Sequence, residues 1–423
     1  MVGFGNREET LGGISAGEMS GGEIVSVADG GTRDLKRTLA RVGGLFRGGP
    51  RELMVATERR VPFLDALRSL AVLLVINAHV STTFATTYAP NLFTKFPVTA
   101  NGWMGVDLFF VLSGYFIGSQ LWKELNRSGT ISMGRFVIRR GLRIWPLYLF
   151  IFAVITIVLH GGTAAREYGW TDLVFITNYL NHGIVSGSWS LCSEEQFYLL
   201  TPATLLLFGR RSMRGYRWGL GVLLGLICLV RWATYFELTG HLLGRYPLAF
   251  QKLYYPFHTH CDGLIAGLFV ANLMTSKEKL KGLLRRPRLL VVLSVLLVGV
   301  MYGFHVEAEQ FLGLAVFFAA VVWWGLQSGT MRFGQHIYYL LSRLSFGMYL
   351  NHEYMQHWIV QQVLPGLGLL HLGSIAASIL GFLLLSVCSA GLSVVTFCLV
   401  EHPFLMIRSA VLGRKSVSPL VAH

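Results

Sequence analysis

Long apolar stretches alternate with short polar ones along most of the chain. From residue 62 to residue 400, apolar windows long enough to cross a bilayer follow one another at short intervals. Such a pattern is typical of a polytopic membrane protein, so we predict an all-α fold with about ten transmembrane helices. The predicted spans are 62–82, 103–121, 144–161, 190–208, 218–236, 247–273, 289–305, 311–328, 337–362 and 374–400.

The basic residues show which loops face the cytoplasm. If the N-terminus lies inside, 30 of the 36 Lys and Arg residues fall in cytoplasmic segments. The positive-inside rule requires this bias, so we expect both termini to be cytoplasmic. The net charge of +14 then faces the cytoplasm and anionic lipid headgroups, and no nucleic-acid partner is expected.

Composition divides the chain into three parts. Residues 1–58 are Gly-rich and polar, so we expect a disordered cytoplasmic segment. Residues 59–408 form the membrane domain, and 409–423 form a short cytoplasmic tail. Met54 directly precedes the first apolar window, so the sequence leaves open whether residues 1–53 are translated.

The first span carries three polar groups that are costly in lipid: Asp65, Arg68 and His79. Arg68 and His79 are eleven residues apart, which is three helical turns plus about 20°, so both lie on one helix face. Their separation along the axis is about 16 Å. We expect Arg68 in the inner half of the membrane and His79 in the outer half.

Three carboxylates are expected at the depth of His79. Asp107 follows the outer end of the second span, and Glu194 and Glu195 follow the outer end of the fourth. Each would lie roughly 20 Å above the cytoplasmic surface. An imidazole beside a carboxylate suits general-base catalysis on a hydroxyl, because the carboxylate orients the ring and stabilises its charged form. Which carboxylate serves His79 stays open.

A basic cluster stands where the third span enters the membrane from the cytoplasm. It consists of Arg139, Arg140 and Arg143. One interpretation is a topogenic anchor. The other is a cradle for phosphates, which guanidinium groups bind well, and this would suit a nucleotide-bearing donor.

Other polar positions have ordinary explanations as well. Ser113 suits either helix packing or substrate contact. His258 and His260 are two apart on a predicted helix and face different ways, so we expect no metal site there. His352 is either a core histidine or a group that supports the site. The five cysteines form no Cys-x-x-Cys pair, which indicates neither a disulfide framework nor a zinc site.

Taken together, the motifs resemble those of the membrane acyltransferase family 3, which O-acylates bacterial surface polysaccharides, lipopolysaccharide, peptidoglycan and some small molecules. The resemblance covers about residues 60–408. It is carried by Arg68-x10-His79 and by the segments 105–114, 136–148, 189–198 and 345–352.

The resemblance implies a short acyl group, most often acetyl, carried by CoA, with the histidine catalytic and the arginine contacting the donor. We transfer these roles to His79 and Arg68. Some members carry a fused extracytoplasmic domain; we expect none in this chain, so a separate extracytoplasmic transferase is a candidate partner. Cys192 and Asn351 depart from the pattern.

We therefore expect an acyl-CoA-dependent O-acyltransferase of the bacterial inner or cytoplasmic membrane, with no bound cofactor or metal. Its acceptor would be a hydroxyl of a carbohydrate or lipid-linked glycan, and His79 would act as general base or transient acyl carrier. The alternatives are an acyltransferase for a small lipophilic acceptor and a glycolipid transporter or flippase. Further candidates for substrate contact or support are Asp65, Ser113, Trp189, Gln196 and His352.

Overall fold

The computed structural model describes ten stretches of the chain, and all of its regular elements there are helices. The described residues are 48–54, 61–87, 91–158, 163–180, 182–241, 247–276, 282–304, 306–328, 334–366 and 374–412. Most of the predicted disordered segment and of the predicted tail therefore lies outside the described residues. Helix α2 (Gly49–Met54) falls within that segment, and its Leu53 is buried.

Described helices overlap every predicted apolar window. They are α3 (Pro62–Thr87), α6 (Met104–Ser128), α7 (Met133–Val158), α10 (Ser188–Thr204), α11 (Met213–Thr239), α13 (Asp262–Thr275), α14 (Pro287–Gly303), α15 (Gln310–Ser328), α16 (Gln335–Trp358) and α18 (Ser374–Thr396). Shorter helices connect them or extend them. These are α4 (Leu92–Lys95), α5 (Pro97–Ala100), α8 (Thr163–Leu173), α9 (Thr177–Leu180), α12 (Pro247–Tyr254), α17 (Leu364–Gly366) and α19 (His402–Val411).

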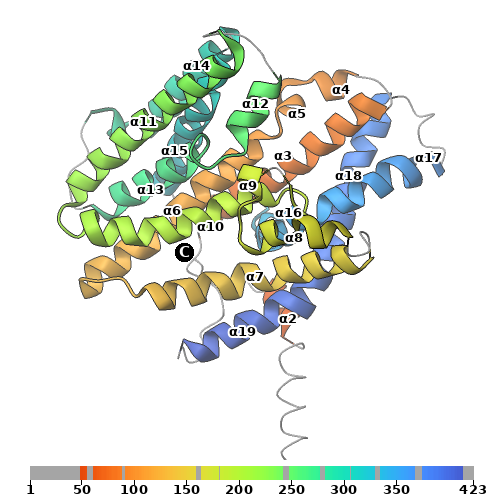
Figure 1. Cartoon of the computed structure of the whole chain (residues 1–423), viewed down its shortest axis with the longest axis horizontal. Coiled ribbons are helices and arrows are strands. Elements are labelled where there is room, and N and C mark those ends of the chain that lie inside the picture. Colours follow the sequence, from red (N-terminus) through yellow and green to blue (C-terminus); the bar gives the residue numbers. More distant parts are fainter. Residues whose placement is uncertain are drawn as a thin grey trace, which may run out of the picture. The chain divides into compact units, whose positions relative to one another are not determined.

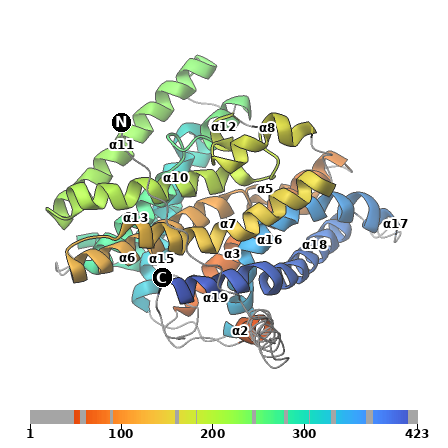
Figure 2. The same ribbon diagram turned by 60° about the horizontal axis from the view of Figure 1, so that its bottom comes forward.

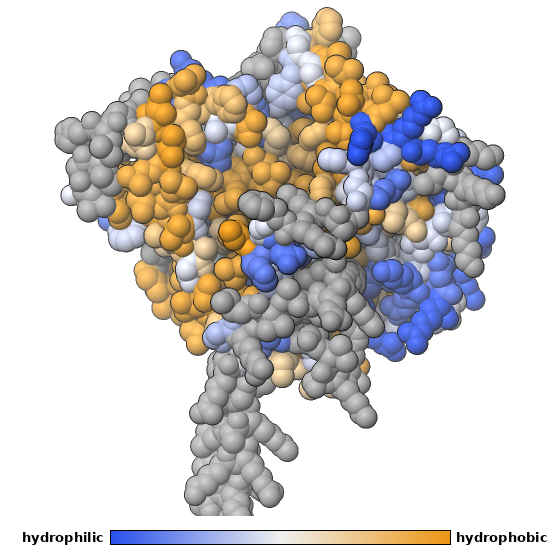
Figure 3. All heavy atoms as spheres, turned by 180° about the vertical axis from the view of Figure 1, so that it is seen from behind, coloured by the Kyte–Doolittle hydropathy of each residue, from blue (hydrophilic) through white to orange (hydrophobic). Residues whose placement is uncertain are grey.

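Six described helices are long and apolar enough to cross a membrane. They are Pro62–Thr86, Met104–Ser128, Met133–Val158, Met213–Thr239, Gln310–Ser328 and Ile375–Val411. Helices α13 and α14 are apolar but shorter. The all-α membrane fold is therefore confirmed, whereas the count of ten spans and the cytoplasmic termini stay predictions. Hydrophobic side chains cover broad areas of the face in Figure 3, as a lipid-facing surface requires.

The predicted sixth span, 247–273, is wrong as a single helix. The chain leaves α12 after Tyr254 and enters α13 only at Asp262. His258 and His260 therefore lie in the intervening turn and not on a helix. Pro256 explains part of the break, because proline disfavours a helical conformation in the residue that precedes it.

Helices α3, α6, α13 and α16 form the framework that positions the polar residues. Helix α6 packs along α13 and α3, and α3 packs along α16. In both ribbon views, α3 and α6 lie between α11 on one side and α18 on the other (Figures 1 and 2). Helix α7 runs beside α19, and their contact brings the chain's last described helix to the arginine-rich part of α7.

Two glycines allow α6 and α13 to touch through their backbones. A Cβ atom on Gly114 would lie 2.0 Å from the carbonyl oxygen of Leu264, and one on Gly267 would lie 2.1 Å from that of Val111. No side chain fits at those distances. The contact fixes the rotation of α6, and with it the direction in which Asp107 and Ser113 point.

Candidate active site

His79 on α3 faces the carboxylate of Glu353 on α16. Its Nε2 atom lies 3.1 Å from Oε1 of Glu353, and both side chains are only partly buried, at 38% and 23% exposure. Gln356, one turn further along α16, donates from Nε2 to the carbonyl oxygen of His79 at 3.0 Å. The pair is therefore held between two packed helices and is still reachable from outside the helix bundle.

His352 contacts the other side of the His79 ring. Its Nε2 lies 3.3 Å from His79 Nδ1, and the two rings meet edge to face with centroids 4.7 Å apart. His352 Nδ1 lies 2.6 Å from the carbonyl oxygen of Tyr349, and His79 Nδ1 lies 2.9 Å from that of Val75. Because carbonyl oxygens only accept, both Nδ1 atoms carry hydrogen. The Nε2 atom of His352 is then an acceptor for His79.

This tautomer has a consequence for the pair of His79 and Glu353. With Nδ1 already protonated, the Nε2 atom of neutral His79 presents a lone pair, which a bare carboxylate would repel. One shared proton between Nε2 and Oε1 resolves the conflict, so the contact is an imidazolium–carboxylate pair or its neutral equivalent. The geometry stabilises positive charge on His79, which a general base acquires during reaction.

The loop that precedes α10 holds Glu353 from the opposite side. The Ser186 hydroxyl donates to Glu353 Oε2, and the Ser186 amide donates to the Tyr354 hydroxyl at 2.6 Å. Gly187 adopts a φ of 71°, and a Cβ there would lie 3.2 Å from Glu353 Oε1. Glycine is therefore suited to this position both by conformation and by space.

Asp172 of α8 anchors the same loop. It accepts hydrogen bonds from the Ile184 amide at 2.5 Å and from the Tyr148 hydroxyl at 2.8 Å. Burial raises the pKa of the Asp172 carboxyl, and the donated hydrogen bonds oppose that rise. Asp172 therefore does not touch Glu353 itself but holds the loop whose Ser186 contacts it.

The three carboxylates expected beside His79 have other partners. Asp107 is fully buried and pairs with His260, whose Nε2 lies 2.9 Å from Asp107 Oδ1. The Nδ1 atom of His260 faces the Tyr254 carbonyl oxygen at 2.7 Å. Glu195 receives a hydrogen bond from Trp145 of α7. The carboxylate beside His79 is thus Glu353, which we had not predicted for this role.

Three of the four predicted phosphate-binding arginines line one cavity. Arg68 of α3 meets Arg140 and Arg143 of α7 there, whereas Arg139 is not among the lining residues that the structure describes. Arg140 is only 8% exposed. Its Nε and Nη2 atoms and the Nε atom of Arg68 are buried and lack hydrogen-bond partners within the described residues. Buried cationic donors of this kind favour an anionic ligand.

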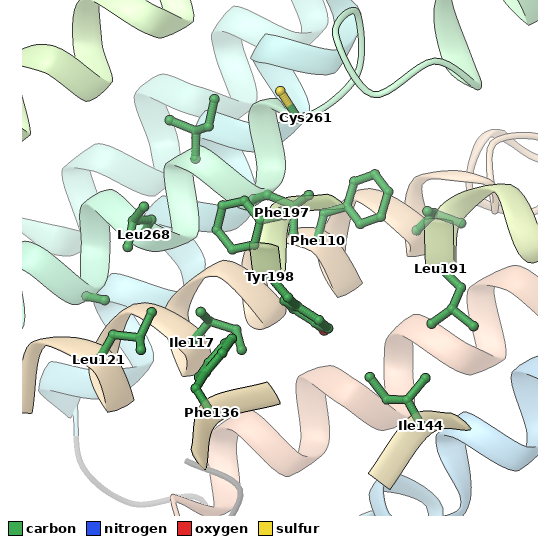
Figure 4. Close-up of a cluster of buried hydrophobic side chains, with 14 of the residues drawn as sticks. Phe110, Ile117, Leu121, Phe136, Ile144, Leu191, Phe197, Tyr198, Cys261 and Leu268 are labelled. Carbon is green, nitrogen blue, oxygen red and sulfur yellow. The ribbon is translucent and has the colours of Figure 1, made fainter. Parts of the chain in front are cut away.

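Glu194 lies in this cavity and not at His79. Its Oε2 accepts a hydrogen bond from Tyr198 at 2.7 Å, and Ser113 Oγ lies 2.9 Å from the same Tyr198 hydroxyl. The guanidinium of Arg140 stands over the Tyr198 ring at 5.4 Å. Figure 4 shows Tyr198 extending beside Leu191 and Ile144, which point toward one another from α10 and α7.

The remaining predicted residues make contacts between different segments of the chain. Asp65 accepts a hydrogen bond from Ser342 at 2.8 Å, which ties α3 to α16. Gln196 donates to the Phe175 carbonyl oxygen at 3.0 Å. Trp189 packs against the ring of Tyr254, with centroids 4.6 Å apart.

The group of His79, His352 and Glu353 could also hold a metal ion instead of a shared proton. The ligand atoms of His79, His352 and Glu353 all lie within 4.8 Å of one another, which is close enough to hold a cation. Hydrogen bonds among the three account for the same spacing. The expected absence of a metal stays a prediction.

Comparison with known proteins identifies the class. The acyltransferase domain family matches residues 61–398. The chain therefore belongs to this family, the membrane acyltransferase family 3 that its motifs resemble, and its helical part is an acyltransferase domain. No solved structure matches the fold.

Several named relatives are O-acetyltransferases. The chain is 32% identical over 170 residues to the peptidoglycan O-acetyltransferase OatA of Listeria monocytogenes, covering 36% of this chain and 25% of the relative. It is 29% identical over 238 residues to a putative O-acetyltransferase of Staphylococcus aureus, covering 51% and 35%. It is 33% identical over 168 residues to the putative peptidoglycan O-acetyltransferase YrhL of Bacillus subtilis, covering 36% and 24%. The matches thus span between about a quarter and a third of these relatives.

Proposed function

We propose that this protein transfers an acyl group, most simply acetyl, from cytoplasmic acyl-CoA to a hydroxyl of a surface glycan. One observation carries the proposal: helix α3 bears both Arg68, in the arginine-lined cavity, and His79, in the pair with Glu353. Eleven residues of helix separate them by about 16 Å. The names of the relatives favour peptidoglycan as the acceptor.

In this proposal the donor's phosphates bind Arg68, Arg140 and Arg143. The buried guanidinium nitrogens that have no partner among the described residues would gain charge-assisted hydrogen bonds there. The thioester would extend from the cavity toward His79. The half-exposed edge of His79 would meet the acceptor hydroxyl.

The transfer step balances without a further reactant. The proton shared by His79 and Glu353 first leaves to water, which gives neutral His79 beside an ionised Glu353. The hydroxyl oxygen then attacks the thioester carbonyl carbon, and His79 Nε2 accepts the hydroxyl proton. Glu353 stabilises the resulting imidazolium. When the carbon–sulfur bond breaks, the same proton passes to the departing thiolate, giving the ester and CoA. A variant of this route places the acyl group on His79 first, with attack by the hydroxyl afterwards.

Acyl transfer by purified protein in proteoliposomes tests the proposal. Radiolabelled acetyl-CoA and a peptidoglycan fragment should give a labelled ester with the wild-type protein and none with His79→Ala. Equal labelling by both proteins would refute the role of His79. Movement of an unmodified glycolipid without ester formation would favour a flippase instead.

A further inference from the structure

The wall of the arginine-lined cavity is largely apolar but carries two small groups of hydrogen-bonded polar side chains, which we call the first and second polar step. Phe109, Phe110, Ile144 and Leu191 are among the residues that supply its apolar lining. Apart from the arginines and Ser345, whose hydroxyl donates to the Ser342 carbonyl oxygen, the polar lining groups belong to two hydrogen-bonded sets. Each set joins two different helices.

The first step lies next to the arginines. It consists of Ser113 on α6 with Glu194 and Tyr198 on α10, joined at 2.9 Å and 2.7 Å through the Tyr198 hydroxyl. Since the Tyr198 hydrogen goes to the carboxylate, the Ser113 hydroxyl donates to Tyr198. The step therefore offers carboxylate and hydroxyl oxygens as acceptors and a serine hydroxyl that can turn to donate.

The second step lies at the other end, toward the pair of His79 and Glu353. Ser190 Oγ lies 2.5 Å from the hydroxyl of Tyr349, and Tyr349 donates to the Gly187 carbonyl oxygen at 3.2 Å. Tyr349 precedes Glu353 by one turn of α16. A Cβ on Gly187 would lie 3.2 Å from Glu353 Oε1 and 3.6 Å from the Tyr349 hydroxyl, so this step directly adjoins the pair.

The spacing of the steps matches a particular ligand chemistry. Ser190 and Glu194 are four residues apart on α10, a rise of about 6 Å. In an extended β-alanine unit, one methylene longer than an ordinary residue, successive amides are about 5 Å apart. The pantetheine arm of CoA contains such a unit. Its backbone from phosphate ester to sulfur equals about four residues, or about 14 Å when extended, close to the span from Arg68 to His79.

We propose that the two steps are subsites for the two amides of the pantetheine arm. This inference rests on the proposed function, since it takes acyl-CoA as the donor. Ser190 and Tyr349 bind the amide nearer the sulfur, and Ser113, Tyr198 and Glu194 bind the amide nearer the phosphates. Each amide brings one donor and one acceptor. The hydroxyl oxygens of each step can accept from the amide N–H, and the serine hydroxyl of each step can turn to donate to the amide carbonyl oxygen.

Truncated donors separate the two subsites. We would measure kcat/KM for acetyl-CoA, for S-acetylpantetheine, which keeps both amides, and for S-acetyl-N-acetylcysteamine, which keeps only the amide nearer the sulfur. The variants are Tyr198→Phe and Tyr349→Phe, each lacking one hydroxyl. Tyr216→Phe is the matched control, because the Tyr216 hydroxyl bonds to Thr204 at 3.0 Å and lies outside the cavity lining that the structure describes.

Tyr198→Phe should lower kcat/KM about fivefold for the two longer donors, the effect of one lost neutral hydrogen bond, and leave the shortest donor unaffected. Tyr349→Phe should lower it for all three, and Tyr216→Phe for none. A loss with Tyr198→Phe that is equal for all three donors would overturn the assignment of subsites. If the wild-type protein used none of these thioesters, the proposed function itself would fall, and the inference with it.

Discussion

His79 Nε2 lies 3.1 Å from Glu353 Oε1, and the two residues come from helices α3 and α16, 274 positions apart in the chain. The pair is tied down on three sides. His352 and Val75 face the Nδ1 atom of His79, and the loop at Ser186 holds the second oxygen of Glu353. Such an arrangement keeps one ring nitrogen directed at one carboxylate oxygen, and the following predictions depend on it.

Neutralising Glu353 should reduce turnover strongly. In Glu353→Gln the imidazolium formed during transfer loses its counter-charge, so we expect kcat to fall roughly 100-fold or more. Glu237→Gln, a change of the same charge on the exposed face of α11, is the control and should leave kcat unchanged. Single-turnover transfer in proteoliposomes measures both. Near-normal turnover by Glu353→Gln would exclude this carboxylate from the reaction.

His352 should act by orienting His79. His352→Phe removes the acceptor at 3.3 Å from His79 Nδ1, and we expect about a tenfold loss of kcat from that missing hydrogen bond. His352→Gln places an amide oxygen near the same point and should recover part of the loss. The KM for acetyl-CoA should be unchanged in both variants. Equal losses in the two variants would argue against an orienting role.

Replacing Arg140 should weaken binding of the donor, whereas replacing Arg139 should not. Arg140→Ala removes buried donors from the cavity, so we expect KM for acetyl-CoA to rise roughly 10- to 100-fold. Arg139→Ala on the same helix is the matched control and should change KM less than threefold, since the described cavity lining does not include Arg139. Initial-rate kinetics in detergent measure both. Equal effects would contradict the placement of the cavity.

The contact between α6 and α13 should tolerate no added methyl group. Gly114→Ala would place a Cβ 2.0 Å from the Leu264 carbonyl oxygen. We therefore expect the free energy of unfolding to fall by at least roughly 3 kcal/mol. Gly225→Ala on α11, where nothing lies within 4 Å, should be neutral or slightly stabilising. Thermal unfolding in detergent compares them. Equal melting temperatures would mean that α6 and α13 are further apart.

Periodicity predicted the features that lie within single helices. The eleven-residue spacing of Arg68 and His79 predicted one helix for both, and both lie on α3, with Arg68 at the arginine-lined cavity and His79 beside Glu353. The arginine cluster was found in the same way. The choice among its members depends on the rotation of α7, which the sequence of α7 alone does not determine.

Pairings between helices were not predictable in this way. Depth along the membrane placed Asp107, Glu194 and Glu195 near His79, but depth says nothing about direction around a helix axis. Asp107 instead turns toward His260, which the break after Tyr254 brings into reach. Glu353 follows His352 in an apolar stretch of the predicted ninth span, so a signal was present. Only the packing of α3 on α16 shows which partner it has.

The central claim is that a donor held at the arginines reacts at His79, on the far side of the same helix bundle. Sealed vesicles of known orientation test it most directly, with radiolabelled acetyl-CoA supplied only to the cytoplasmic face and a peptidoglycan fragment only to the opposite face. The account predicts labelled ester on the acceptor's side with the wild-type protein and none with His79→Ala. Label that appears equally with His79→Ala, or only when donor and acceptor share one compartment, would contradict it.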